Sequence, residues 1–222
     1  MNRLIFLLFS LAFTIQALAQ LPNLKKVVQK TESVASKMKT QQILSDITTG
    51  TFTDERDGTT YKTVTINGQV WMAENLRYKT DNCISYENQM DTDKYGYLYS
   101  YQEALKVCPD GWTLAPEEEA WSEVRKLIGV APEVGPAFKD KDAWKQFKSK
   151  KNNNKTQLSV LPGGKYSSKS NTFEYVGKRA YLWTSNNYEG EGWAVIFYFD
   201  KDNLHFEHFN SSNSASVRCV KN

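Results

Sequence analysis

Alternation of hydrophobic and polar residues is clearest just after residue 50. The run from Tyr61 to Ile66 has the two-residue period of a strand, and Asn67-Gly68 separates it from a second apolar run over 69–72. Asn-Gly is a favoured two-residue hairpin turn because both central residues adopt positive φ. A preceding Asp-Gly pair at 57–58 predicts another turn. The pattern therefore predicts a β-hairpin over residues 57–72.

Two short helices are predicted in the middle of the chain. The first follows Ser100, a good N-cap, and runs to Leu105. The second opens at Pro116 and three glutamates, which complement the positive end of a helix dipole. Its apolar stripe is interpreted as core rather than as a ligand site, and it consists of Trp121, Val124, Leu127 and Ile128.

The last third of the chain predicts strands separated by Gly- and Asn-containing turns. A long polar excursion over 129–156 precedes them, and its basic stretch at 148–155 is interpreted as a solvated loop. Two helices followed by a meander give an α+β class with antiparallel sheet, two short helices and long loops. The predicted strands cover 158–161, 173–176, 179–184, 193–199 and 215–220.

The N-terminal residues have a different character. Residues 1–19 combine Arg3, an apolar run and a small-x-small site at Ala17-Leu18-Ala19, which predicts a removable signal peptide. Residues 20–49 contain no aromatic residue, and their apolar positions recur at loose helical intervals. We interpret them as a helix-prone spacer, either a partly ordered linker or a docking segment. The domain itself is expected over 50–222.

Composition narrows the class of protein further. The 28 basic and 25 acidic residues give a net charge of +3, and this near balance gives no case for a nucleic-acid partner. No later segment is apolar enough for a transmembrane helix. We expect an exported protein of the periplasm, the cell surface or the medium. Its three cysteines, Cys83, Cys108 and Cys219, predict one bridge and one remaining thiol in an oxidising compartment.

Six separated motifs resemble one family of exported bacterial domains, the Fibrobacter succinogenes major paralogous domain. They stand in fixed order between Gly50 and Asn222: TFTDERDGTTYKTVTINGQVWMAENLRY, YGYLYSYQEAL, CPDGWTLAPEEEAW, LPGGKY, YLWTSN and SVRCVKN. The resemblance implies a variant of the C-type-lectin-like fold and brings no general biochemical activity with it. One departure is Thr113, at a position where the family usually has histidine.

The resemblance also implies a disulfide. CPDGW and SVRCV each hold a cysteine that the family normally carries, so a Cys108–Cys219 bridge is expected, with Cys83 as the odd thiol, free or used between chains. A structural role is favoured over a redox role, because Arg218 neighbours Cys219 on a strand and points to the opposite face.

Candidate ligand-binding residues are the aromatic and amide side chains near residues 183–193. Trp183 and Trp193 offer faces on which a sugar could stack, although core packing is the commoner role of tryptophan. Tyr188 lies in a glycine-flanked loop over 186–192, where binding residues are common. Asn186 ends a stretch that distantly resembles the sugar-binding signature of calcium-dependent lectins.

No catalytic, metal or cofactor site is predicted. The acidic clusters near Asp54 and Asp91 lack the EF-hand pattern and are interpreted as solvated turn residues. His205 and His208 are interpreted as surface residues of a strand pair. The sequence has no signature of a nucleophile elbow, zinc protease, P-loop or dinucleotide site.

We therefore expect a non-catalytic binding or surface-display domain whose partner is a glycan or an envelope protein. The alternatives are an enzyme of unrecognised type acting on extracellular polysaccharide, and a purely structural envelope protein. The oligomeric state is left open.

Overall fold

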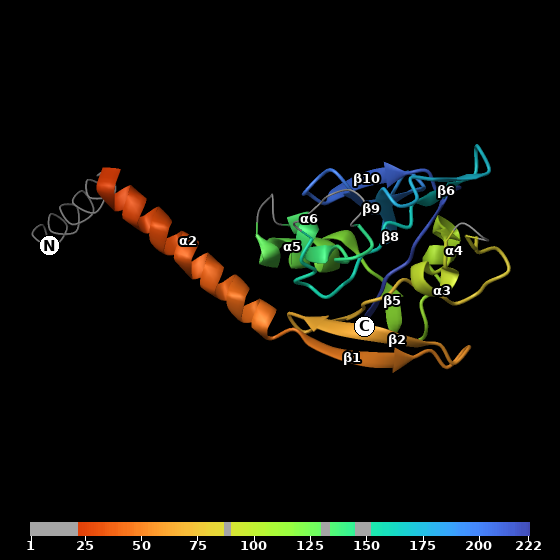
Figure 1. The fold of residues 1–222 in the computed structure, drawn as a ribbon, viewed down its shortest axis with the longest axis horizontal. Coiled ribbons are helices and arrows are strands. Elements are labelled where there is room, and N and C mark those ends of the chain that lie inside the picture. The colour runs from red at the N-terminus through yellow and green to blue at the C-terminus, as the bar shows by residue number, and fades with distance from the viewer. Residues whose placement is uncertain (1–21, 87–89, 130–133, 145–151) are drawn as a thin grey trace, which may run out of the picture. The chain divides into compact units, whose positions relative to one another are not determined.

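A computed structural model describes residues 22–86, 90–129, 134–144 and 152–222 (Figure 1). The predicted signal peptide lies outside the described residues. The chain divides into two compact units at Gln42 and Ile43, which we describe separately. Most of helix α2, which spans Pro22–Ser45, belongs to the first unit, and the helix lies within the range expected to be a helix-prone spacer. The first strand of the second unit begins at Thr48, two residues before the expected domain start.

The second unit is a mixed α/β structure whose named strands all pair antiparallel. A five-stranded sheet has the order β1-β2-β3-β12-β5, a three-stranded sheet β10-β9-β8, and a four-stranded sheet β4-β11-β6-β7. The strands are β1 Thr48–Thr53, β2 Thr60–Ile66, β3 Gln69–Met72, β4 Tyr99–Ser100, β5 Trp112–Leu114, β6 Lys165–Ser167, β7 Thr172–Glu174, β8 Arg179–Tyr188, β9 Glu191–Tyr198, β10 His205–Phe209, β11 Ser214–Ala215 and β12 Cys219–Lys221.

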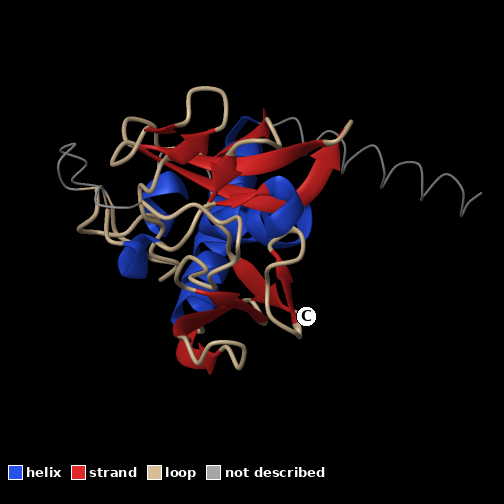
Figure 2. Ribbon diagram, turned by 90° about the vertical axis from the view of Figure 1, so that its right-hand side faces the viewer, coloured by secondary structure: helices blue, strands red, loops and turns tan. Residues whose placement is uncertain are grey.

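Short helices connect and separate these sheets. In Figure 1 they lie between the β1–β2 pair and the β8–β10 sheet, and Figure 2 shows the two groups of strands from the side. The described helices are α3 Thr92–Tyr95, α4 Tyr101–Ala104, the π-helical η1 Glu117–Ser122, α5 Glu123–Ile128 and α6 Val134–Phe138. The structure thus has more short helices than the two predicted.

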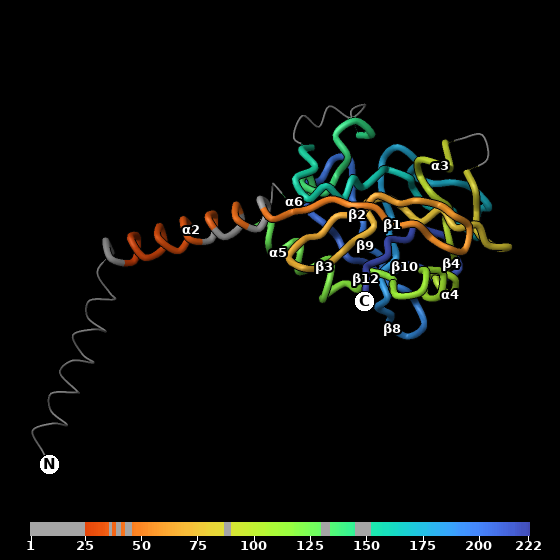
Figure 3. Tube along the Cα trace, turned by 90° about the horizontal axis from the view of Figure 1, so that it is seen from below, coloured from red at the N-terminus to blue at the C-terminus, as the bar shows by residue number. Residues whose placement is uncertain are grey.

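The local predictions in the first half are confirmed. Strands β2 and β3 pair antiparallel across Asn67 and Gly68, whose φ angles are 50° and 81°. Strands β1 and β2 then run side by side along their whole length (Figure 3). At the start of α4, Ser100 and Glu103 form a capping box. The Asn67-Gly68 turn and the start of α4 depend on residues within four positions of one another, whereas the β1–β2 pairing joins residues as far apart as Thr48 and Thr65.

The core consists of two clusters on opposite faces of β9. Val195 and Phe197 point into the first, where the Trp71 and Trp121 rings lie 4.8 Å apart. The intervening Ile196 points into the second. Because β9 is covered on both faces, its sequence is nearly continuously apolar rather than alternating. The stripe of the second predicted helix is core, as expected, with Trp121, Val124 and Ile128 buried and Leu127 packed against them.

The polar excursion expected over 129–156 contains buried residues in its described part. Every residue of α6 is buried, and Trp144 is 1% exposed, with its indole N–H donating to the Val160 carbonyl over 2.8 Å. Lys139 is also 1% exposed, and its ammonium donates to the Tyr198 and Lys201 carbonyls over 2.6 and 3.0 Å. Two backbone carbonyls therefore make the burial of a lysine tolerable in this segment.

Two predicted strands are also corrected. Residues 158–161 form only an isolated bridge at Val160, and the closing strand predicted over 215–220 is interrupted at Val217 and Arg218. At the interruption the Val217 carbonyl accepts from Leu76 N–H and the Arg218 carbonyl from Ala115 N–H, both over 3.0 Å. The backbone carbonyls of Val217 and Arg218, which could have continued the β-strand pairing, are instead hydrogen-bonded to other segments.

Cys108 and Cys219 form the expected disulfide, with a Cα–Cα distance of 5.9 Å. Cys219 is fully buried, and the bridge joins β12 to the CPDGW turn across 111 positions of sequence. Cys83 is a free thiol, partly buried against the second core cluster.

We predict that the double substitution Cys108→Ser and Cys219→Ser lowers the free energy of unfolding by about 2–5 kcal/mol, because the unfolded chain loses a long closed loop. Urea unfolding of the purified protein measures this. Cys83→Ser is the matched control and should cost much less, because it breaks no bridge. A non-reducing peptide map in which Cys83 is linked to Cys108 would contradict the assignment.

We also predict that the domain loses stability at alkaline pH. Burial raises the pKa of Tyr61 to about 12 and raises those of Tyr86 and Tyr99 further, so the folded state keeps protons that the unfolded state releases above about pH 10. Burial lowers the pKa of Lys139 to about 8 and that of Arg218 to about 9, so these two groups make stability rise with pH. Lys139 does so mainly below about pH 10, and within the tyrosine range the three tyrosines outnumber Arg218. The urea midpoint should therefore fall between about pH 10 and pH 12. An unchanged midpoint, with tyrosinate absorbance appearing in the folded state, would refute this.

Candidate functional site

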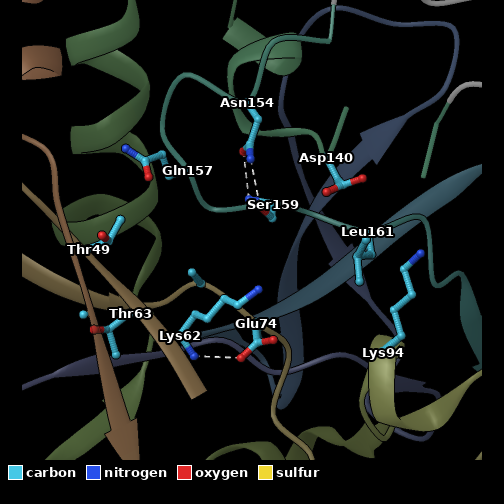
Figure 4. Close-up of a pocket in the computed structure, with 12 residues that line it drawn as sticks. Thr49, Lys62, Thr63, Glu74, Lys94, Asp140, Asn154, Gln157, Ser159 and Leu161 are labelled. Atoms are coloured by element: carbon cyan, nitrogen blue, oxygen red, sulfur yellow. Dashed lines mark hydrogen bonds between the residues drawn. The ribbon is translucent and has the colours of Figure 1, made fainter. Parts of the chain in front are cut away.

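A pocket of about 530 Å³, lined mainly by polar residues, lies between the β1–β2–β3 sheet on one side and Asp140 and the loop over 154–161 on the other. This volume is within the range of small-ligand pockets. Figure 4 shows Asn154, Gln157 and Asp140 on one side and Lys62 and Glu74 on the other. The lining is completed by Thr49, Gly50, Thr63, Ala73, Lys94, Ser159 and Leu161. Amide, hydroxyl, ammonium and carboxylate groups are thus all available to one ligand.

The loop over 154–159 has unusual backbone geometry. Asn154, Gln157 and Ser159 have φ angles of 48°, 58° and 48°. Asparagine tolerates the left-handed region, but glutamine and serine visit it at a cost of order 1–3 kcal/mol each. Such conformations persist only where surrounding contacts enforce them, and they gather at functional sites. All three of these residues line the pocket.

Side-chain hydrogen bonds hold the loop in this shape. The Asn154 amide donates to the Ser159 hydroxyl over 2.8 Å and accepts from Ser159 N–H over 2.9 Å. Thr156 is fully buried, and both its N–H and its hydroxyl donate to the Ala137 carbonyl over 3.0 Å. The loop is therefore fixed to α6 before any ligand arrives.

Arg218 binds the backbone of the loop over 154–159. This side chain is fully buried, and its guanidinium donates to the Leu158 carbonyl over 2.6 Å and to the Ser159 carbonyl over 3.4 Å. It also donates to the Asn75 amide oxygen over 2.8 Å and to the Met72 carbonyl over 3.2 Å. Burial lowers the pKa of Arg218 to about 9, which still leaves it charged at neutral pH.

The two carboxylates of the pocket are engaged by nearby donors. Glu74 accepts from Lys62 N–H over 2.7 Å and lies 3.7 Å from the Arg77 guanidinium. Asp140 accepts from the N–H groups of Asp142 and Ala143 over 2.9 and 2.8 Å. These bonds orient both carboxylates and leave lone pairs that can accept ligand hydroxyls.

The sequence-predicted ligand residues lie elsewhere, and two of them have structural roles. Trp183 is fully buried, and its indole donates to the Tyr99 carbonyl over 2.8 Å, so it cannot present a face to a ligand. The Asn186 side chain accepts from Glu117 N–H over 2.7 Å and thereby binds the start of η1. The expected loop over 186–192 is instead a hairpin, in which β8 and β9 pair up to Tyr188 and Glu191.

The other two predicted residues, Tyr188 and Trp193, form an exposed aromatic cluster with His208. The His208 ring lies 4.1 Å from the Trp193 ring and 5.3 Å from the Tyr188 ring. His208 pairs directly with Trp193 across β9 and β10, so the strand pair expected around the histidines is present. Tyr188 is 57% exposed, so the cluster offers a second surface on which a ligand could stack.

The acidic residues considered for calcium have structural partners. Asp54 is fully buried rather than solvated, and its carboxylate lies 2.6 Å from the Arg56 guanidinium. Burial would raise the pKa of Asp54, but the hydrogen bonds and charge of Arg56 outweigh it and lower the pKa. Asp91 accepts from Asp93 N–H at the start of α3. Within the described ranges, no three His, Cys, Asp or Glu side chains gather as metal ligands.

Sequence reasoning missed the pocket because its residues are dispersed and individually ordinary. Gln157 and Ser159 are neither glycine nor asparagine, and nothing in their type indicates positive φ. The only local signal was the asparagine-rich stretch that ends at Asn154, which was interpreted as a solvated loop.

Comparison with protein families matches residues 64–221 to the Fibrobacter succinogenes major domain. No curated protein matches the chain, and neither does any solved structure. Among the described helices, none has the length and apolar character needed to cross a bilayer.

Proposed function

The chain belongs to the Fibrobacter succinogenes major domain family, and we propose that it is an exported domain that binds saccharides without catalysing their reaction. The observation that carries the proposal is the polar pocket whose loop over 154–159 is held in strained backbone conformations. Strain that persists at a concave polar site is typical of ligand binding.

The chemistry of the lining supports a polyhydroxylated ligand. A sugar ring presents hydroxyl groups that both donate and accept, and it requires partners of both kinds around it. Asn154, Gln157 and Ser159 supply amide and hydroxyl groups on one side, and Lys62 and Glu74 supply a donor and an acceptor on the other. Because the loop is fixed by its own hydrogen bonds, little conformational entropy is lost on binding.

A C-type-lectin-like arrangement is the finer fold assignment that we propose. Long loops supported by antiparallel sheets, together with a disulfide that ties the last strand to the middle of the domain, support it. The non-catalytic assignment is supported by Glu74 and Asp140, which are held by neighbouring backbone donors.

Export is the proposed setting for this binding. The Cys108–Cys219 disulfide supports an oxidising compartment, as does the signal pattern of residues 1–19. The periplasm, the cell surface and the medium all satisfy this condition.

We predict that the purified protein binds a defined subset of saccharides on a glycan array. Calorimetric titration of one array hit should then show binding about 10-fold weaker in the Gln157→Ala protein, which loses a hydrogen bond of about 1–1.5 kcal/mol. Gln157 is exposed, so this substitution leaves the core intact. Mass analysis of the incubated saccharide should show no conversion.

The double substitution Tyr188→Ala and Trp193→Ala is the matched control, because it removes the aromatic cluster and leaves the pocket unchanged. If this variant loses binding and Gln157→Ala does not, the site lies at the aromatic cluster. Absence of binding to every saccharide would contradict the proposed function, and cleavage of the saccharide would make the protein an enzyme.

A further inference from the structure

Helix α2 exposes an unusual amount of apolar surface. Val27, Val28, Val34 and Met38 are 56%, 46%, 44% and 69% exposed. The other large hydrophobic side chains left exposed in the described chain are Leu105, Tyr175 and Tyr188 of the second unit. Scattered exposed hydrophobic residues are normal, but several on one helix indicate a surface that another molecule or a membrane covers when the protein functions.

Three of these four residues lie along one face of α2, and Val28 lies about 100° away from Val27 around the helix. Val27, Val34 and Met38 are spaced by seven and four positions, which keeps them within one stripe at about 100° per residue. Thr31 falls within the same stripe, and its hydroxyl donates to the Val27 and Val28 carbonyls over 3.0 and 2.8 Å. The Thr31 hydroxyl thus makes its hydrogen bonds within the helix and needs no partner outside it.

Lysines border this stripe on one side. Lys30 and Lys37 are seven positions apart and follow that edge, whereas Lys25 lies on the far side of the helix near Glu32, and all three lysines are exposed. The sequence of α2 contains five lysines and one glutamate, so the helix carries a net charge of +4. Two such helices would repel each other, whereas an anionic surface would attract either one.

We propose that α2 is an interfacial helix that lies on an anionic phospholipid surface. Its valines and Met38 enter the boundary between headgroups and acyl chains, and the flanking lysines extend their stems over this layer to reach the phosphates. The charge of the helix prevents it from spanning the bilayer. This attachment does not depend on the proposed saccharide binding, and it would hold the binding domain at the membrane.

Co-sedimentation with lipid vesicles tests the proposal. We use the purified protein, after its N-terminus has been established by intact mass. It should bind vesicles of mixed phosphatidylcholine and phosphatidylglycerol but not vesicles of phosphatidylcholine alone. Binding should weaken as salt is raised, because the attraction is electrostatic. The triple substitution Lys25→Gln, Lys30→Gln and Lys37→Gln should weaken it on the order of 100-fold.

Two further variants make the result specific. Lys169, Lys178 and Lys221 are exposed lysines of the second unit, and their substitution by glutamine changes the charge equally but should leave vesicle binding unchanged. Val27→Ser with Val34→Ser keeps every lysine and should weaken binding by removing the apolar contribution.

Several outcomes would overturn the proposal. One is equal binding to both vesicle types, and another is binding that the three α2 lysine substitutions leave unchanged. A third is a concentration-dependent dimer, detected by sedimentation velocity, that becomes a monomer in the Val27→Ser, Val34→Ser protein. The last result would identify a second copy of the chain as the occupant of the stripe. Saccharide titration of the same variants separates this proposal from the pocket, because none of these substitutions touches its lining.

Discussion

A buried guanidinium that has no ion-pair partner among the described residues must find its hydrogen-bond acceptors in the fold. Arg218 finds them in an amide oxygen of Asn75 and in backbone carbonyls of Met72, Leu158 and Ser159. The next residue, Cys219, is covalently tied to Cys108. The closing segment is thus fixed to the hairpin, the CPDGW turn and the pocket loop within two residues. Because an unsatisfied buried charge is very costly, these segments must assemble together.

The pocket follows from this constraint. Leu158 and Ser159 direct their carbonyls at Arg218, and the backbone accommodates this by taking left-handed conformations at Gln157 and Ser159. The Asn154–Ser159 pair and buried Thr156 then fix the polar face of the loop. A ligand meets a surface that has already been ordered by folding, which is the property that lowers the entropic cost of binding. The exposed stripe of helix α2 belongs to the other unit of the chain, and no residue of it lines the pocket.

Sequence reasoning succeeded where the determinants are local. The Asn67-Gly68 turn and the N-cap at Ser100 each depend on residues within four positions, and both are present in the structure. The Cys108–Cys219 pairing came from the family resemblance rather than from periodicity.

Sequence reasoning failed where interacting residues lie far apart in the chain. The strand expected over 158–161 is absent because Arg218, about 60 positions away, engages its carbonyls. Trp183 and Trp193 lie on adjacent strands and look alike in sequence, but one faces the core and the other an open surface. Periodicity shows that neighbouring residues alternate between two faces, but it does not show which face another segment covers.

The central claim is that Arg218 holds the loop over 154–159 in its binding-ready shape. Hydrogen–deuterium exchange of peptides covering that loop tests this claim most directly when it is measured in the Arg218→Lys protein. The Arg179→Lys protein is the control, because it loses a guanidinium on β8 instead. A lysine keeps the charge but cannot reach all four acceptors from one planar group. We predict faster exchange of the loop in Arg218→Lys, with β8 and β9 still protected and with no change in Arg179→Lys. Unchanged protection of the loop in a folded Arg218→Lys protein would contradict the account.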